Sequence, residues 1–199
     1  AQANGLRTLF GLPGAQIYPL FDAAARRGVR LIVPRHEQAA GFMAMGYARA
    51  LGEPGVLAVV PGPGVLNASA ALCTAMGTCT PIVCLLGQVP AQYLGKGRGH
   101  LHELLDQQAT LRTLIKDALR AEGASDASAV VNRAFALAQS GRPGPVSVEM
   151  CWDTMAAAAP AETLPPPPLP APPAADPDEV ARAAALIARA RKPMIMCGA

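Results

Sequence analysis

One glutamate and three histidines are the residues best suited to moving protons in this sequence. Glu37 follows His36 in the segment PRHEQAAGF, and His100 and His102 lie in the glycine-rich segment YLGKGRGHLHE. Imidazole titrates near neutral pH, so these histidines suit proton transfer. A glutamate in the first turn of a helix can also serve only the helix dipole, and histidines in a glycine-rich loop can be ordinary surface residues. Both interpretations stay open on these residues alone.

Two turns of glycine and proline would let a ligand approach the backbone closely. The first is GLPGAQ at 11–16, and the second is PGPG at 61–64, directly before a segment of helical composition. Glycine has no Cβ to keep a ligand away, and the backbone amides at the start of a helix attract anions. Any strand-to-helix turn in an α/β protein uses similar residues, so neither turn alone establishes a binding site.

Several other kinds of site are missing from the sequence. The GxGxG run at 95–99 neither follows a clear strand nor opens a helix, and Gly95-Lys96 lacks the other residues of a phosphate-binding loop. No histidine or cysteine group has the spacing of metal ligands, and no GxSxG nucleophile motif is present. We therefore expect no metal ligands in this sequence.

The elements that must position these residues alternate along the chain. Short apolar runs are separated by segments of helical period, which is typical of α/β proteins with a mostly parallel sheet and helices on both faces. Strands are expected at 7–10, 30–33, 56–60, 82–86 and 145–149. Two helical faces are expected, one with Ile17, Leu20, Phe21 and Ala24 and one with Ala40, Met43, Tyr47 and Leu51. Further helices are expected at 65–77 and 127–139.

Composition narrows the class of protein. Hydrophobic residues make up 51% and charged residues 16%, which favours a globular chain over a disordered one. The net charge of +3 is spread along the chain without a basic cluster, so nucleic acid is not an expected partner. Five cysteines without a CxxC pair indicate reduced thiols and a cytoplasmic protein. The sequence contains no recognisable signal peptide or membrane span.

The chain divides into three parts. A first domain is expected at 1–155, with Gly5 ending a helix that has been cut off. Residues 156–175 contain TLPPPPLPAPP, which favours an extended polyproline conformation and predicts an interdomain linker. Residues 176–199 predict the start of a truncated second α/β domain, in which Asp176 caps a helix with Pro177 at its first position and RKPMIMCGA begins a strand.

One long segment resembles a known family. PRHEQAAGFMAMGYARALGEPGVLAVVPGPGVLN, at 34–67, is similar to the pyrimidine-binding domain of thiamine diphosphate-dependent enzymes of the acetolactate synthase and 2-oxo acid decarboxylase superfamily. Three further pieces match in the family's order, namely FGLPGAQIYPLFDA (10–23), TPIVCLLGQVP (80–90) and GRPGPVSVEMCWD (141–153). Each piece is weak by itself, but the ordered set covers most of 5–155. The resemblance implies the thiamine diphosphate-binding fold.

The resemblance implies roles for individual residues. Glu37 would be catalytic: its carboxylate would hydrogen-bond a ring nitrogen of the cofactor's aminopyrimidine and favour the imino tautomer, which deprotonates the thiazolium carbon that attacks a 2-oxo acid. Such a carboxylate should be shielded from water. The cofactor-binding set would be Glu37, Gly62, Pro63, Gly64 and Asn67. A substrate-side loop would contain Gly11, Pro13, Gly14 and Ala15.

The sequence departs from the family's pattern at three places. Pro61 stands where the family often has serine, and Ala15 replaces a glycine common in acetolactate synthases. Leu101, His102 and Glu103 stand where acetolactate synthases tend to have Phe-Gln-Glu. Several decarboxylases of the family carry paired histidines in roughly this loop. His100 and His102 therefore become candidate catalytic residues for a chemistry other than acetolactate formation.

The resemblance also implies partners and alternatives. In the family the active site lies between the pyrimidine domain of one subunit and the diphosphate domain of another, which implies a homodimer or homotetramer acting on a small 2-oxo acid. Mg²⁺ would be held by residues beyond this sequence, and the central domain of some relatives holds FAD. This fragment alone is not expected to be active. An acyl-CoA lyase or oxidase on the same scaffold, or a noncatalytic α/β binding module, are the alternatives.

Overall fold

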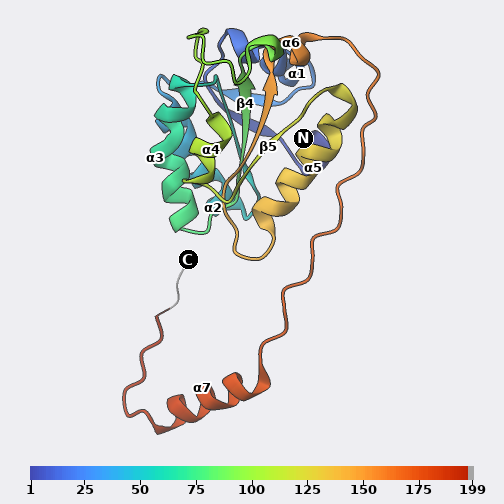
Figure 1. The fold of residues 1–199 in the computed structure, drawn as a ribbon. Coiled ribbons are helices and arrows are strands. Elements are labelled where there is room, and N and C mark those ends of the chain that lie inside the picture. The colour runs from blue at the N-terminus through green and yellow to red at the C-terminus, as the bar shows by residue number, and fades with distance from the viewer. Residues whose placement is uncertain (197–199) are drawn as a thin grey trace. The chain divides into compact units, whose positions relative to one another are not determined.

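The structure, a computed structural model, describes residues 1–196 and has a six-stranded sheet at the centre of the first part of the chain (Figure 1). The strands are β1 (Thr8–Gly11), β2 (Arg30–Ile32), β3 (Gly55–Val59), β4 (Ile82–Gln88), β5 (Asp117–Arg120) and β6 (Val146–Cys151). Their order is β2-β1-β3-β4-β6-β5, and every neighbouring pair is parallel. The predicted α/β class with a parallel sheet is therefore confirmed.

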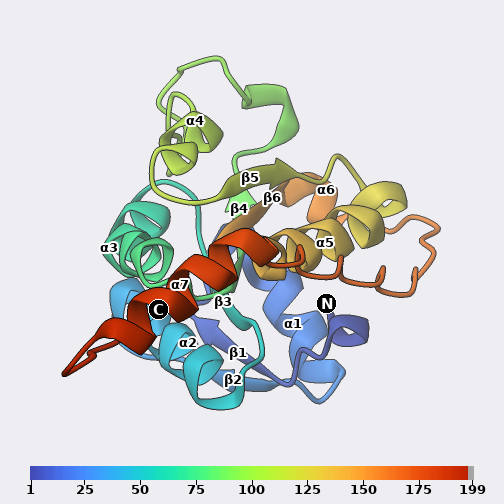
Figure 2. The same ribbon diagram turned by 90° about the horizontal axis from the view of Figure 1, so that it is seen from below.

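Helices cover both faces of this sheet (Figures 1 and 2). The main helices of the first part are α1 (Tyr18–Arg26), α2 (Glu37–Leu51), α3 (Pro63–Gly77), α4 (Gln107–Arg112), α5 (Ala124–Gln139) and α6 (Trp152–Ala156), with short 3-10 helices η1 (Gln2–Asn4), η2 (Ala15–Ile17) and η3 (Ala91–Tyr93). Alternate residues of each strand enter opposite cores, as a pleated strand requires. Leu9 packs on the side of α1 and α5, whereas Phe10 packs on the side of α2, α3 and α4.

Polar residues fix the ends of several helices. The Nδ1 of His36 accepts a hydrogen bond from the Gln38 backbone N–H at 3.1 Å at the start of α2, and Gly52 ends that helix with a φ of 67°. Asp106 accepts from the Ala109 backbone N–H at 2.9 Å and starts α4. His36 is thus a capping residue, which places Glu37 at the first position of α2.

The buried face of α2 differs from the predicted one. Ala40 is buried as expected, but Met43 is 44% exposed and Leu51 is 55% exposed. The buried stripe contains small residues instead, namely Ala40, Gly41, Ala44 and Ala48. A Cβ on Gly41 would lie 2.6 Å from the Ala71 Cβ of α3. The prediction was wrong for Met43 and Leu51, because the close contact between α2 and α3 leaves room only for small residues, whereas Tyr47 packs against the core and contacts Phe10.

The other elements mostly follow the sequence pattern. All five predicted strands exist within two residues of their expected bounds, and the predicted face with Ile17, Phe21 and Ala24 is buried. Strand β5 and helix α4 were missed. Both are short, and β5 has only the four residues DALR, so no clear period distinguishes them from a loop.

Contacts divide the chain into two compact units, the first ending at Leu169 and the second beginning at Pro170. The proline-rich segment is anchored to the first unit. The backbone N–H of Leu164 donates to the Ser128 Oγ at 2.8 Å, and the Asn132 Nδ2 donates to the carbonyl oxygens of Leu164 and Pro165 at 3.2 and 2.9 Å. Both side chains belong to α5, so this helix holds the middle of the predicted linker.

The second unit contains one helix, α7 (Pro177–Arg189), in its described part. Asp176 caps it, as predicted, by accepting from the Asp178 backbone N–H at 2.8 Å. The strand predicted within RKPMIMCGA does not form at 191–196, because an extended segment needs a neighbouring strand to pair with. The last three residues of that prediction, at 197–199, lie outside the described residues. None of the helices described is long and apolar enough to cross a membrane.

Candidate functional site

The carboxyl ends of neighbouring strands bring the predicted site segments to one edge of the sheet. The segment with Gly14 follows β1, the segment with Glu37 follows β2, and the PGPG turn follows β3. The chain leaves β1 toward β2 on one side and returns to β3 on the other. In open parallel sheets, ligands bind at the carboxyl edge where the strand order reverses in this way. The topology therefore points to the region beside β1 and β3.

Glu37 is held by a side chain from a neighbouring helix. It is half-buried at the first position of α2, and its Oε2 accepts a hydrogen bond at 3.0 Å from the Asn67 Nδ2 of α3. Among the described residues nothing donates to its Oε1. The carboxylate is thus fixed through one oxygen and has the other free to meet a ligand.

The PGPG turn has a backbone that favours glycine. Gly62 has a φ of 59° and a ψ of −112°, and a Cβ there would lie 2.4 Å from the carbonyl oxygen of His102. Its N–H donates to the Gln107 Oε1 at 3.1 Å. Pro63 then opens α3, where its missing N–H costs no hydrogen bond, and Asn67 lies one turn further along the helix. The turn thereby sets where α3 begins and hence where Asn67 lies.

The glycine-rich segment after β4 is folded around Glu103. The carboxylate of Glu103 accepts hydrogen bonds from the backbone N–H groups of His100 and Gly97, each at 2.9 Å. The His100 ring stacks on Tyr93 with a centroid separation of 4.6 Å. The backbone N–H of His100, followed by that of Gly97, holds the pKa of Glu103 below its ordinary value of 4.5.

This pKa shift predicts an acid-sensitive loop. Because the folded-state pKa of Glu103 is depressed, the two hydrogen bonds stabilise the loop above pH 4.5 and are lost as the pH falls through the lower, folded-state pKa. The protection of the Gly97 and His100 amides, measured relative to their intrinsic exchange rates, should therefore fall on acidification in the wild type. Glu103→Gln should show low protection of both amides at every pH. Equal protection in both proteins at pH 6 would contradict the prediction.

His102 contacts the segment that follows β1. Its Nδ1 lies 3.3 Å from the Gln16 Oε1, and the Gln16 Nε2 donates to the Leu101 carbonyl oxygen at 3.3 Å. His102 also has a φ of 66°, a left-handed conformation that is uncommon outside glycine. The structure thus brings His102 to the predicted substrate-side loop and to the PGPG turn, whereas His100 packs on Tyr93. Among the described residues, no hydrogen bond joins either histidine to Glu37.

The first residue of the predicted substrate-side loop takes part in packing the sheet. Gly11 is the last residue of β1, and a Cβ there would lie 1.9 Å from the Ala58 carbonyl oxygen of β3. A Cβ on Gly14 would lie 2.4 Å from a methyl group of Val60. Pro13 and Ala15 are exposed. Gly11 therefore permits close strand packing, and the surface available to a ligand is that of Pro13 and Ala15.

A buried polar network lies behind the PGPG turn, and the sequence patterns missed it. The carboxylate of Glu149 in β6 accepts hydrogen bonds from Gln88, Gln107 and Arg120. Glu149 is only 1% exposed. A charged residue within the apolar strand segment VSVEM was the available signal, because a buried carboxylate requires partners.

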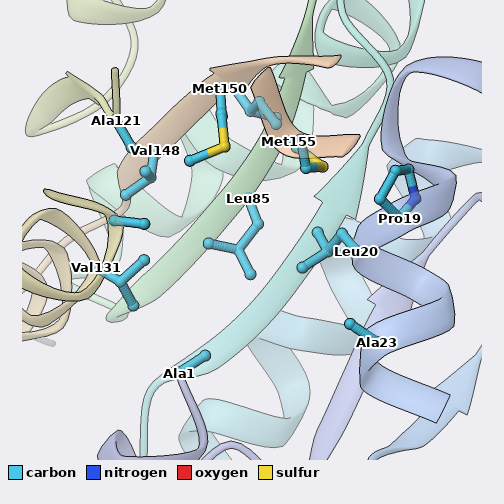
Figure 3. A pocket seen from close by; sticks show the side chains of 12 residues that line it. Ala1, Pro19, Leu20, Ala23, Leu85, Ala121, Val131, Val148, Met150 and Met155 are labelled. Carbon is cyan, nitrogen blue, oxygen red and sulfur yellow. The ribbon is translucent and has the colours of Figure 1, made fainter. Parts of the chain in front are cut away.

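An apolar pocket lies on another part of the molecule. It has a volume of about 300 Å³ and lies between α1 and α5, over β4 and β6 (Figure 3). The side chains that line it are all apolar, among them Leu85, Val148, Met150 and Met155 (Figure 3). They offer no group for acid–base chemistry. Within the described residues, no cluster of histidine, cysteine, aspartate or glutamate is arranged to hold a metal ion.

The six-stranded parallel sheet with helices on both faces defines an α/β domain. The family described as "Thiamine pyrophosphate enzyme, N-terminal TPP binding domain" matches residues 1–110. The chain belongs to this family of thiamine diphosphate enzymes.

Curated relatives agree with this assignment. The chain is 36% identical over 198 residues to a probable 2-ketoarginine decarboxylase of Pseudomonas aeruginosa, covering 98% of the chain and 35% of that protein. It is 34% identical over 199 residues to the acetolactate synthase isozyme 1 large subunit of Escherichia coli, covering 99% and 35%. The mitochondrial acetolactate synthase catalytic subunit of Saccharomyces cerevisiae is 38% identical over 151 residues, covering 75% and 22%. The chain spans about a third of the length of the first two relatives.

Proposed function

We propose that this chain is the N-terminal part of a thiamine diphosphate-dependent decarboxylase or carboligase acting on 2-oxo acids. The observation that carries the proposal is the position of Glu37, half-buried at the carboxyl edge of the sheet with one oxygen fixed by Asn67. Membership of the family and the names of the relatives support it. An acyl-CoA lyase or oxidase would share Glu37 and is distinguished by the substrate panel below.

The residues present fit the aminopyrimidine end of this cofactor. Glu37 offers a carboxylate oxygen to a ring nitrogen, and the hydrogen bond from Asn67 keeps that carboxylate from turning away. Gly62 and Gly64 leave the turn without side chains, and Pro63 offers an exposed apolar surface to a flat ring. When bound, thiamine diphosphate would supply an acidic thiazolium carbon that can bond to the 2-oxo carbon once it has lost its proton, and a cationic thiazolium ring that can take up the electron pair left when carbon dioxide departs. The part of Glu37 is to hold a proton at the ring nitrogen.

The proposal also includes a metal ion, a second cofactor and a second subunit in addition to this chain. Mg²⁺ would be held by a diphosphate-binding domain outside the sequence, and FAD, if bound, by the domain that α7 begins. A second copy of the protein, in a homodimer or homotetramer, would cover the exposed side of Glu37 and shield it from water. Such an enzyme would work in the cytoplasm on a small 2-oxo acid.

Within this proposal, His102 is the better candidate for donating a proton to the product. Its ring contacts Gln16, on the loop where the substrate would enter, whereas the His100 ring is stacked on Tyr93. An imidazole ring can both give up and take back a proton, which suits a residue that donates a proton in each turnover.

The test uses the complete polypeptide that carries this chain. Binding of thiamine diphosphate with Mg²⁺ is measured by calorimetry, and carbon dioxide release is measured with a panel of 2-oxo acids that includes pyruvate and 2-ketoarginine. Cofactor binding together with cofactor-dependent turnover would support the proposal and identify the substrate. Absence of thiamine diphosphate binding would contradict it and favour a noncatalytic module.

A further inference from the structure

Three buried side chains meet behind the PGPG turn. Glu149 of β6, Gln107 of α4 and Gln88 of β4 are each at most 2% exposed. Arg120 of β5 joins them from the rim of the sheet, with 26% of its side chain exposed. Burying a carboxylate among apolar strands costs several kcal/mol unless its oxygens are paired. Such a group therefore needs hydrogen-bonding partners, and the hydrogen bonds fix the orientation of those partners.

The hydrogen bonds of Glu149 fill both of its oxygens. Its Oε1 accepts from the Arg120 Nε at 2.8 Å and from the second guanidinium nitrogen, Nη2. Its Oε2 accepts from the Gln107 Nε2 at 2.7 Å and from the Gln88 Nε2 at 3.2 Å. No buried side-chain polar atom among the described residues lacks a partner. Every buried polar atom of the network is therefore satisfied.

This arrangement sets the direction of the Gln107 amide. Its Nε2 donates to Glu149 and also to the Gly87 carbonyl oxygen at 3.3 Å. Its Oε1 must then face the other way, where it accepts from the backbone N–H of Gly62 at 3.1 Å. Turning the amide over would place its oxygen against the carboxylate of Glu149 and leave Gly62 without an acceptor.

We propose that Gln107 is a positioning residue for the cofactor-activating carboxylate, with Glu149 fixing its orientation. Gln107 holds Gly62, the turn at Gly62 sets the start of α3, and α3 carries Asn67, whose amide holds Glu37. The buried carboxylate on β6 thus acts on Glu37 through two amide side chains and one helix turn. This inference rests on the proposed function, since it assigns Gln107 a part in activating the cofactor.

Gln88 provides a matched control. It has the same residue type, the same burial and a hydrogen bond to the same carboxylate oxygen as Gln107. Its Oε1, however, accepts from the Val89 backbone N–H at 2.7 Å and does not reach the PGPG turn. Removal of either amide costs Glu149 one donor, but only removal of Gln107 releases Gly62.

The experiment compares Gln107→Met with Gln88→Met in the complete polypeptide. Hydrogen exchange at Gly62 is followed without cofactor, and kcat and KM are measured with thiamine diphosphate and Mg²⁺. For Gln107→Met we expect exchange at Gly62 to accelerate about tenfold. We expect kcat to fall by about 10- to 100-fold with little change in the substrate KM, because a displaced catalytic group loses rate steeply. Gln88→Met should keep both within about threefold of the wild type, although it is destabilised to a similar extent.

Two outcomes would overturn the inference. One is unchanged exchange at Gly62 in Gln107→Met, and the other is an equal loss of kcat in both variants, which would mean that the network serves stability alone. If Gln107→Met does not fold, Gln107→Asn and Gln88→Asn replace the pair, because the shorter side chain withdraws the amide but keeps its polarity. If the wild type itself shows no thiamine diphosphate-dependent turnover, the proposed function fails, and exchange at Gly62 still decides whether Gln107 holds the turn.

Discussion

Replacing Glu37 by glutamine is expected to lower cofactor-dependent carbon dioxide release by roughly 10²- to 10⁴-fold, the usual contribution of a positioned acid–base group. Glutamine has the same size and keeps an oxygen that can accept from Asn67, which lies 3.0 Å from the carboxylate. It lacks the negative charge that holds a proton at the ring nitrogen. Because the shape of the site is retained, the affinity for thiamine diphosphate should change only a few-fold. Steady-state turnover and calorimetry measure the two quantities separately.

Glu53→Gln is the matched control for this prediction. Glu53 pairs with Arg7 at 3.7 Å near the amino ends of β1 and β3, at the opposite edge of the sheet from Glu37. An exposed pair of this kind contributes little, so turnover should stay at the wild-type level. Turnover of Glu37→Gln within tenfold of the wild type would remove Glu37 from the chemistry, whatever the control shows.

Gly62→Ala is expected to disrupt the site through the backbone. A methyl group at this position would lie 2.4 Å from the His102 carbonyl oxygen, and the φ of 59° with a ψ of −112° is strained for any residue with a Cβ. Backbone strain alone costs about 1–3 kcal/mol, and the contact with His102 adds to it. The midpoint of urea unfolding should therefore fall, and the affinity for thiamine diphosphate should fall with it, because the start of α3 must move.

Gly46→Ala makes the same chemical change where there is room for it. Gly46 lies inside α2 with no atom within 4 Å of the added methyl group. Alanine favours a helix interior over glycine by about 0.5–1 kcal/mol, so this variant should unfold at a slightly higher urea concentration. A Gly62→Ala protein as stable as the wild type and with unchanged cofactor affinity would refute the account of the turn.

The sequence predicted those parts of the fold whose signal is local. Strands β3 and β4 are nearly continuous apolar runs that are buried on both faces, so composition alone locates them. Strand β5 lies at the edge of the sheet and has one buried residue, Ala118, between half-buried ones over only four positions. Its place is decided by pairing with β6, which comes about 25 residues later in the sequence, and no local pattern carries that information.

In the candidate site, too, the local motifs were predictable from the sequence and the long-range contacts were not. Glu37 and the PGPG turn were recognisable because they lie in contiguous motifs, and the topology then brought them to one edge of the sheet. The hydrogen bonds that orient them join residues 30 or more positions apart, as between Glu37 and Asn67 or between Gly62 and Gln107. Gln107 in particular lies in the unremarkable segment LLDQQATL, where only the three-dimensional contact with Glu149 distinguishes it from Gln108.

The anchoring of the proline-rich segment on α5 shortens the tether of the second unit. Ser128 and Asn132 hold the chain at Leu164 and Pro165, so only residues 166–175 can act as a free spacer before α7. Rich in proline, that stretch spans on the order of 30 Å when extended, at about 3.1 Å per residue. The effective concentration of one unit around another rises as the linker between them shortens. Two hydrogen-bonding side chains on one helix therefore set the length of free chain between the first unit and α7.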